Sequence, residues 1–135
     1  MNLKTLERVM SVNLSEITKR TVSANEYIGN LRPPFCQRFL ERKQTYRLEQ
    51  EAIDGLKRFA NNYIIVAFSA EWCKDCTTNI PVLALISEAT GLKVRVFGGL
   101  KKDPLSHTRK WRIPPSPIEI ETFRIEKIPH MIVYD

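Results

Sequence analysis

The sequence predicts an α/β domain that follows a helical N-terminal segment. From residue 63 onward, short apolar runs alternate with segments of helical pattern, the order expected for a sheet with crossover connections. Before residue 63, apolar residues recur at helical spacing instead. A pair of cysteines, Cys73 and Cys76, stands where the first apolar run ends. We therefore divide the chain into a helical extension, residues 1–61, that packs on an α/β domain, residues 62–135.

The first sixty residues are expected to be entirely helical. The first helix is amphipathic, with apolar residues three or four positions apart: Leu3, Leu6, Val9, Met10, Leu14 and Ile17. A break is expected over residues 25–34, where Gly29 and two consecutive prolines stop one helix and start another. The second helix carries the apolar stripe Phe35, Phe39 and Leu40. The third is expected from about residue 48 to 60, with Ile53, Leu56 and Phe59 facing inward.

The α/β part begins with a strand over residues 63–68, a short apolar run rich in β-branched and aromatic residues. A helix follows over residues 74–90, interrupted by Pro81 and closed by Gly91. The next strand is expected at residues 93–97 because Val94 and Val96 alternate with charged residues.

Beyond that strand the pattern is less regular. Residues 104–111 are expected to form a short helix. Residues 112–118 contain three prolines and are expected to form an extended loop. The last expected element is a strand over residues 128–134, with a proline near its start.

Cys73 and Cys76 form a Cys-x-x-Cys pair between the first strand and the following helix. Free N–H groups and the helix dipole stabilise an anion at a helix N-terminus, so Cys73 is expected to attack a disulfide as the thiolate. Cys76, one turn further in, is expected to be more buried and to resolve the mixed disulfide. The main alternative is a zinc or iron site completed by His107 or His130, although structural zinc usually has four ligands and a second cysteine pair is missing.

Three sites, in order along the chain, resemble the thioredoxin family. Residues 66–73, Val-Ala-Phe-Ser-Ala-Glu-Trp-Cys, resemble the strand and tryptophan that lead into its active site. Pro81 falls where the family kinks its active-site helix, and residues 123–129, Phe-Arg-Ile-Glu-Lys-Ile-Pro, resemble the approach to its cis-proline loop. The resemblance covers residues 63–135 and implies a thioredoxin-like sheet flanked by helices. It also implies a thiol-disulfide oxidoreductase that needs no cofactor or metal.

The resemblance assigns further roles near the cysteines. A cis Pro129 would place the backbone of Ile128 beside Cys73, where an extended client peptide can pair. Trp72 would shield the sulfurs and offer a contact surface, with plain packing as the equal alternative. The partners implied are disulfide-containing client proteins and an electron donor such as a thioredoxin-reductase-like protein.

The sequence departs from the family pattern at the active site. Lys74 and Asp75 replace the usual Gly-Pro; Lys74 would stabilise a neighbouring thiolate and Asp75 would oppose it, which leaves the direction of the redox chemistry open. Ala67 stands where the family keeps a buried carboxylate, so the proton is expected to go to water, Asp75 or Glu71. An insertion at residues 113–121 is expected to reshape the substrate groove.

The family fold continues past the cis-proline strand with another strand and a closing helix, whereas this sequence ends at Asp135. An edge strand would then be unpaired and one sheet face uncovered. Three remedies are open: the N-terminal helices cover the face, a second copy does so in a homodimer, or the natural polypeptide is longer. A protein-binding module that keeps the fold without redox turnover is the alternative function.

Charge and cysteine content bear on the partners and the cellular location of the protein. The net charge of +6 suits acidic partners, but acidic residues interrupt the basic run formed by Arg38, Arg42, Lys43 and Arg47, so a solvated helix face is favoured over nucleic-acid binding. An odd number of cysteines, three, argues against a secreted disulfide scaffold, and neither a signal-peptide core nor a membrane-spanning run occurs. The expected location is the cytoplasm. Cys36 is expected to be a small buried hydrophobe rather than a third redox thiol.

Overall fold

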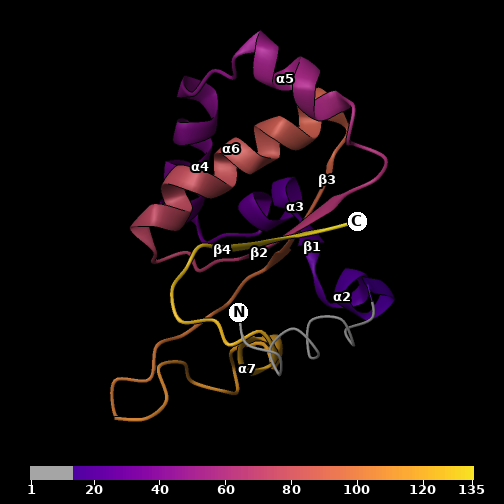
Figure 1. Ribbon diagram of the computed structural model, residues 1–135. Coiled ribbons are helices and arrows are strands. Elements are labelled where there is room, and N and C mark those ends of the chain that lie inside the picture. The colour runs from indigo at the N-terminus through magenta and orange to yellow at the C-terminus, as the bar shows by residue number, and fades with distance from the viewer. Residues whose placement is uncertain (1–13) are drawn as a thin grey trace.

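A mixed four-stranded sheet forms the centre of the computed structural model, which describes residues 14–135 (Figure 1). The strand order is β1-β3-β2-β4. The strands are β1 (Val22–Ser23), β2 (Ile64–Phe68), β3 (Lys93–Phe97) and β4 (His130–Tyr134). β2 and β3 are parallel, whereas β1 runs antiparallel to β3 and β4 antiparallel to β2. This arrangement confirms the predicted α/β class and the strands expected around residues 63–68, 93–97 and 128–134.

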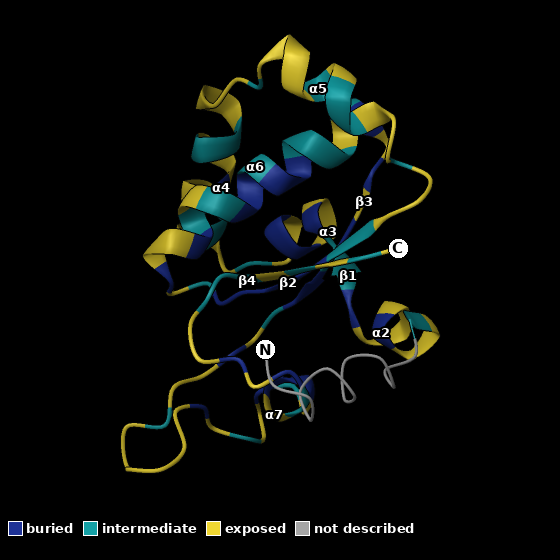
Figure 2. Ribbon diagram, in the orientation of Figure 1, coloured by how far each residue is buried: buried dark blue, intermediate teal, exposed yellow. Residues whose placement is uncertain are grey.

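Helices cover both faces of the sheet (Figure 1). The helices are α2 (Leu14–Arg20), α3 (Ala24–Gly29), α4 (Pro33–Thr45), α5 (Gln50–Lys57), α6 (Lys74–Thr90) and α7 (Glu119–Thr122). Figure 1 shows α3, α4, α5 and α6 on one side of the sheet and α2 and α7 on the other. In Figure 2 the buried residues gather in the central strands and on the helix surfaces that face them.

The strand register separates the two faces of the core, because successive side chains on a strand point to opposite sides. Phe68 and Phe97 are register partners, and their rings stack with centroids 5.0 Å apart. The edge of Phe68 also meets Phe123, which directly follows α7. The neighbouring register pair, Ala67 and Val96, is buried on the opposite face, toward α3 and α6.

α6 has the bounds that the sequence predicts. Cys73 caps its first turn, and Gly91 closes it in the left-handed conformation with φ 79°. Pro81 lies inside the helix and is buried. A C-terminal glycine of this kind ends many helices because it adopts positive φ without a steric penalty.

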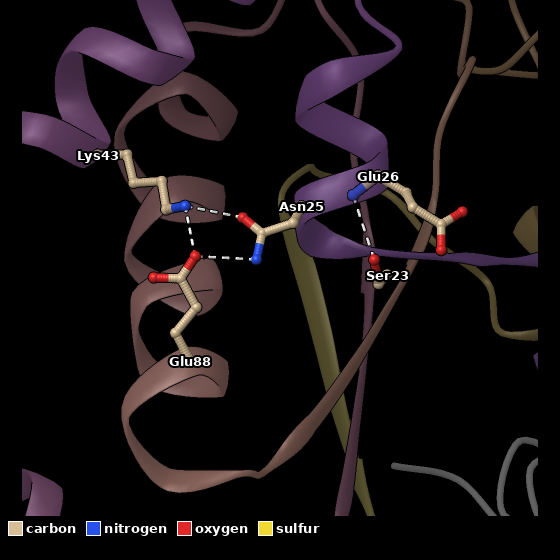
Figure 3. A network of polar contacts seen from close by, with 5 residues as sticks. All are labelled: Ser23, Asn25, Glu26, Lys43 and Glu88. Carbon is tan, nitrogen blue, oxygen red and sulfur yellow. Dashed lines mark hydrogen bonds and ion pairs between the residues drawn. The ribbon is translucent and has the colours of Figure 1, made fainter.

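Polar contacts join α3 and α4 to α6 (Figure 3). Lys43 Nζ contacts Glu88 Oε1 at 2.5 Å and Asn25 Oδ1 at 2.9 Å, and the Asn25 amide donates to Glu88 at 3.0 Å. Arg42 Nε donates to the carbonyl oxygen of Thr78, also on α6, at 3.1 Å. Two members of the basic run on α4 therefore hold helices together.

The opposite face is tied down by two arginines. Arg95 of β3 donates to the Thr21 hydroxyl at 3.0 Å and to the carbonyl oxygens of Thr18 and Thr21. Arg20 forms an ion pair of 2.8 Å with the buried Glu119 of α7. These contacts hold α2 against the sheet and against α7.

The N-terminal segment is not entirely helical, and this expectation was wrong. β1 lies within it because residues 22–23 pair with the edge of β3. This pairing is a long-range contact, and a strand of two residues is too short to show a pattern in the sequence. α3 occupies residues 25–29, the first half of the expected break over residues 25–34, and is capped by the Ser23 hydroxyl. Phe59 is exposed rather than inward-facing. Of the first predicted helix, Leu14 and Ile17 lie in α2, and residues 1–13 lie outside the described residues.

The segment after β3 also differs from expectation. Residues 104–111 form turns rather than a helix, because the chain folds back into a hairpin closed by a bridge between Lys102 and Trp111. A loop is confirmed over residues 112–118, but it is not extended as expected: it folds into turns, and the Ser116 N–H donates to the carbonyl oxygen of Arg112 at 3.0 Å. Ile113–Pro114 and Pro114–Pro115 are both cis. The short helix α7 then follows, which the sequence did not indicate.

β4 forms one edge of the sheet. It pairs with β2, and within residues 14–135 no strand pairs with its other side. Met131 and Val133, which share the face of β4 on the side of Ala67, are 42% and 63% exposed. Within the same range, no helix is long and apolar enough to span a bilayer.

Candidate active site

The two cysteines lie where β2 passes into α6, and both are free thiols. Cys73 is 8% exposed, whereas Cys76 is fully buried. The Cys76 backbone N–H donates to Cys73 Sγ at 3.2 Å, as expected for a helix cap. The less deeply buried cysteine is therefore the one whose sulfur accepts a hydrogen bond from the first turn of the helix.

Cys73 also contacts the loop before β4. Its Sγ donates to the carbonyl oxygen of Ile128 at 3.6 Å. The Ile128–Pro129 peptide bond is cis, as the sequence resemblance implied. The structure thus brings Cys73, Ile128 and Pro129 together from positions more than fifty residues apart.

Cys76 occupies a site that favours the neutral thiol. Burial and, next, its hydrogen bond with Cys73 raise the pKa of Cys76 to about 12. Hydrogen bonds from the Ser69 hydroxyl and from the Ala70 backbone act in the opposite direction and lower that pKa. Ser69 is itself completely buried.

Ser69 is linked to a second hydroxyl behind the cysteines. Its Oγ lies 2.9 Å from the Tyr27 hydroxyl oxygen, and the Ser69 hydroxyl donates this hydrogen bond. Burial raises the pKa of Tyr27 above its ordinary range, so the phenol stays protonated. The chain Cys76–Ser69–Tyr27 is a buried series of groups, each able to donate and accept a proton.

The sequence analysis did not single out Ser69 or Tyr27. Ser69 did offer a signal, because it is a polar residue at the end of an otherwise apolar strand. Tyr27 offered none, since it lies 42 positions away from Ser69 and only the packing of α3 brings it close.

The two carboxylates expected to receive a proton, Glu71 and Asp75, differ in their surroundings. Glu71 forms an ion pair with Arg32 at the start of α4. Asp75 is exposed on the first turn of α6. Ala67, at the position of the family carboxylate, is fully buried. Neither carboxylate is among the groups that shift the pKa of Cys76.

A groove of about 430 Å³ opens at Cys73. Its lining residues come from the cysteine motif, the hairpin and the loop before β4: Trp72, Cys73, Lys74, Asp75, Lys102, Lys110, Trp111, Glu126, Lys127 and Ile128. Trp72 is held in place by a hydrogen bond of 2.9 Å from its Nε1 to the carbonyl oxygen of Leu100. The groove is shaped by residues 102–111, and none of the residues 113–121 lines it.

The remaining candidates lie away from this groove or apart from one another. Cys36 is half-buried and lines a separate depression along α4. His107 is exposed on the hairpin, and His130 packs against Phe68, where burial lowers the pKa of the imidazole. Among residues 14–135, no three histidine, cysteine or acidic side chains gather as metal ligands would.

Comparison with known proteins identifies the family of the chain. A family model described as thioredoxin matches residues 21–105, which is more than half of the 135-residue chain and includes both cysteines. The match begins at Thr21, just before β1, within the segment that the sequence analysis assigned to the extension. Searches of curated proteins and of solved structures found no match.

Proposed function

Because the chain belongs to the thioredoxin family, we propose that it exchanges disulfides of client proteins through Cys73 and Cys76. One observation carries the proposal: Cys73 lines the groove, its Sγ lies 3.2 Å from the backbone nitrogen of Cys76, and Cys76 is fully buried. An accessible sulfur at a helix N-terminus with a second thiol one turn away is the arrangement that disulfide exchange requires. The groove beside Cys73 leaves room for a client.

The exchange takes two steps that together move two electrons to the client. The Cys73 thiolate attacks one sulfur of the client disulfide, which forms a mixed disulfide and releases the other client sulfur as a thiolate. Cys76 then loses its proton and attacks Cys73 Sγ. This step forms the Cys73–Cys76 disulfide and releases the first client sulfur. The two protein protons balance the two new client thiols, and a dithiol electron donor restores the reduced protein.

Deprotonation of Cys76 is the step in which this chain differs from the family pattern. A carboxylate is absent at Ala67, Glu71 is paired with Arg32, and Asp75 is exposed in the groove. Neither Glu71 nor Asp75 is among the groups that shift the pKa of Cys76. We assign the supporting role to Ser69, whose hydrogen bond lowers the pKa of Cys76, with Tyr27 behind it. When Cys76 ionises, the Ser69 hydroxyl can turn from Tyr27 and donate its hydrogen bond to the Cys76 thiolate. The Tyr27 hydroxyl can then donate to Ser69 Oγ, 2.9 Å away, and hold it in that orientation.

The other site residues position the client. The backbone of Ile128, held by Pro129, is the proposed pairing edge for an extended client segment beside Cys73. Trp72 is the proposed contact surface, and Lys74 and Asp75 modulate the potential as neighbours of the attacking sulfur. The proposed location is the cytoplasm, where such a pair remains available for redox chemistry.

Reduction of insulin by dithiothreitol tests the proposal. The wild-type protein is expected to accelerate precipitation of the insulin B chain, and Cys73→Ser is expected to abolish the acceleration. Cys36→Ser is the matched control, because Cys36 lies in a separate depression, and it should retain the wild-type rate. Equal rates for wild type and Cys73→Ser would overturn the proposal and leave a binding module as the function.

A further inference from the structure

The groove beside Cys73 carries an excess of positive charge. Four lysines line it, against two carboxylates, Asp75 and Glu126. The lysines are Lys74, Lys102, Lys110 and Lys127. All four are exposed, and none forms an ion pair with any residue in the part of the chain that the structure describes. Their charges are therefore available to a ligand.

The hairpin of residues 101–112 presents two of these lysines to the groove. The bridge between Lys102 and Trp111 is flanked by backbone hydrogen bonds from Asp103 N to Lys110 O at 2.9 Å and from Arg112 N to Lys101 O at 2.8 Å. These bonds fix Lys102 and Lys110 on opposite arms. The hairpin sequence, Lys-Lys-Asp-Pro-Leu-Ser-His-Thr-Arg-Lys-Trp-Arg, has five lysines and arginines and one acidic residue.

Each of these two lysines lies over a tryptophan ring. Lys102 Nζ is 5.1 Å from the ring centroid of Trp72, and Lys110 Nζ is 6.0 Å from that of Trp111. Both indole N–H groups bind backbone carbonyl oxygens, of Leu100 and Ile125, so the rings are fixed. A cation held near an aromatic face is restricted in position, which makes it a better defined contact for a carboxylate than a free lysine.

We propose that this groove selects clients whose reactive disulfide is flanked by acidic residues, with Lys102 and Lys110 binding the client's carboxylates. The inference rests on the redox function proposed above, because Cys73 lies in the same groove and the ligand must bring a disulfide to it. A polynucleotide would match the charge but supplies no sulfur to Cys73. An acidic polypeptide segment satisfies both features of the groove.

Two cyclic disulfide peptides of the same length, one with glutamates and one with lysines beside the cystine, provide the test. At low ionic strength, kcat/KM for the acidic peptide is expected to exceed that for the basic peptide by about tenfold or more, and added salt should reduce the ratio. The double variant Lys102→Glu/Lys110→Glu should lower or invert the ratio. The control Arg47→Glu/Lys93→Glu makes the same net charge change at exposed sites outside the groove and should keep it.

A binding titration separates this inference from the redox proposal. The acidic peptide with both cysteines replaced by serine should change the fluorescence of Trp72 and Trp111, and the lysine double variant should weaken the binding. Equal kcat/KM values for both peptides, with activity that still requires Cys73, would overturn the inference and leave the redox function standing. Loss of all turnover with acidic binding intact would overturn the redox function alone. Single-stranded RNA that binds more tightly than the acidic peptide would assign the groove to nucleic acid and overturn the inference.

Discussion

The surroundings of Cys76 affect its ionisation in two opposite ways. Burial holds its pKa at about 12, while Ser69 pulls the pKa down. A resolving thiol of this kind stays protected until the mixed disulfide forms. The balance makes Ser69 a positioning residue that acts through Cys76, with Tyr27 orienting it.

Ser69→Ala is expected to slow the second step of disulfide exchange without slowing the first. Ellman's reagent distinguishes the steps, because attack by Cys73 and attack by Cys76 each release one coloured thiolate. In a Cys36→Ser background, the second phase should slow by about tenfold, the effect of roughly one pKa unit on Cys76. Tyr27→Phe should act in the same direction more weakly. Two unchanged phases in Ser69→Ala would remove Ser69 from the mechanism.

The raised pKa of Cys76 also predicts how stability varies with pH. The folded protein holds the Cys76 proton up to about pH 12, whereas the unfolded chain releases it near pH 8.5 to 9. The contribution of Cys76 to the free energy of unfolding is therefore complete below about pH 8.5. It is lost as the pH rises from there toward the pKa of the folded protein, about 12. Between pH 9 and 10, reduced wild type should lose about 1 kcal/mol more unfolding free energy than Cys76→Ala. Urea titrations that give parallel pH profiles for both proteins would contradict this assignment.

At the residue scale, local pattern predicted the motif but not its surroundings. Cys73, Cys76 and Pro129 are recognisable from their neighbours in the sequence. Tyr27 and Lys102 join the site through contacts made across the fold. Such contacts produce no periodic pattern in the sequence. The hydroxyl groups behind Cys76 and the basic groove are therefore recognised only in the structure.

Gly98, directly after β3, shows how an element depends on a close approach. A Cβ built on Gly98 would lie 2.6 Å from Tyr27 Cε2, inside van der Waals contact. The Tyr27 ring has little freedom to move, because it meets Phe39 edge-on at 5.9 Å and its hydroxyl binds Ser69. The absence of a side chain at Gly98 therefore lets α3 approach the end of β3.

Gly98→Ala is expected to lower the free energy of unfolding by about 1–3 kcal/mol, because the ring must shift in a packed core. The same shift should slow the Cys76 phase of the Ellman reaction. Gly55→Ala is the control: no atom lies within 4 Å of its Cβ, and alanine favours the helix there. Urea unfolding measures both variants, and equal stability of Gly98→Ala and wild type would show that Tyr27 is not confined as described.

Elements with strong local signals were predicted most closely. α6 has an apolar run before it, a cap at Cys73 and a glycine after it, and its bounds match the expectation. β1 has two residues and exists because β3 offers a free edge. The hairpin at residues 101–112 replaced an expected helix, since cross-strand bonds to residues ten or so positions away outweighed local preference.

Across the described part of the molecule, residues 14–61 and the α/β part share one core. Ile17, Tyr27, Ile28 and Phe39 belong to the same buried cluster as the strands and α6. β1 extends the sheet, and the family match itself starts at residue 21. The boundary at residue 61 therefore marks a change in sequence pattern, and we expect the residues on its two sides to fold as one unit.

A fragment of residues 62–135 is accordingly expected not to fold by itself. It lacks β1 and the helices α3 and α4 that cover α6, so a large apolar surface would be left in water. Circular dichroism during a urea titration should show a cooperative transition for residues 1–135 and none for the fragment. A cooperative transition in the fragment would mean that the N-terminal segment is an accessory to an independent domain.

The central claim is that Cys73 attacks and Cys76 resolves, and trapping of the mixed disulfide tests it most directly. A disulfide-bonded client is incubated with Cys76→Ser or with Cys73→Ser, both in the Cys36→Ser background, and adducts are mapped by non-reducing mass spectrometry. The account predicts that Cys76→Ser accumulates a client covalently bound at Cys73, while Cys73→Ser accumulates almost none because Cys76 is buried. Adducts of equal amount in both variants, or in neither, would contradict it.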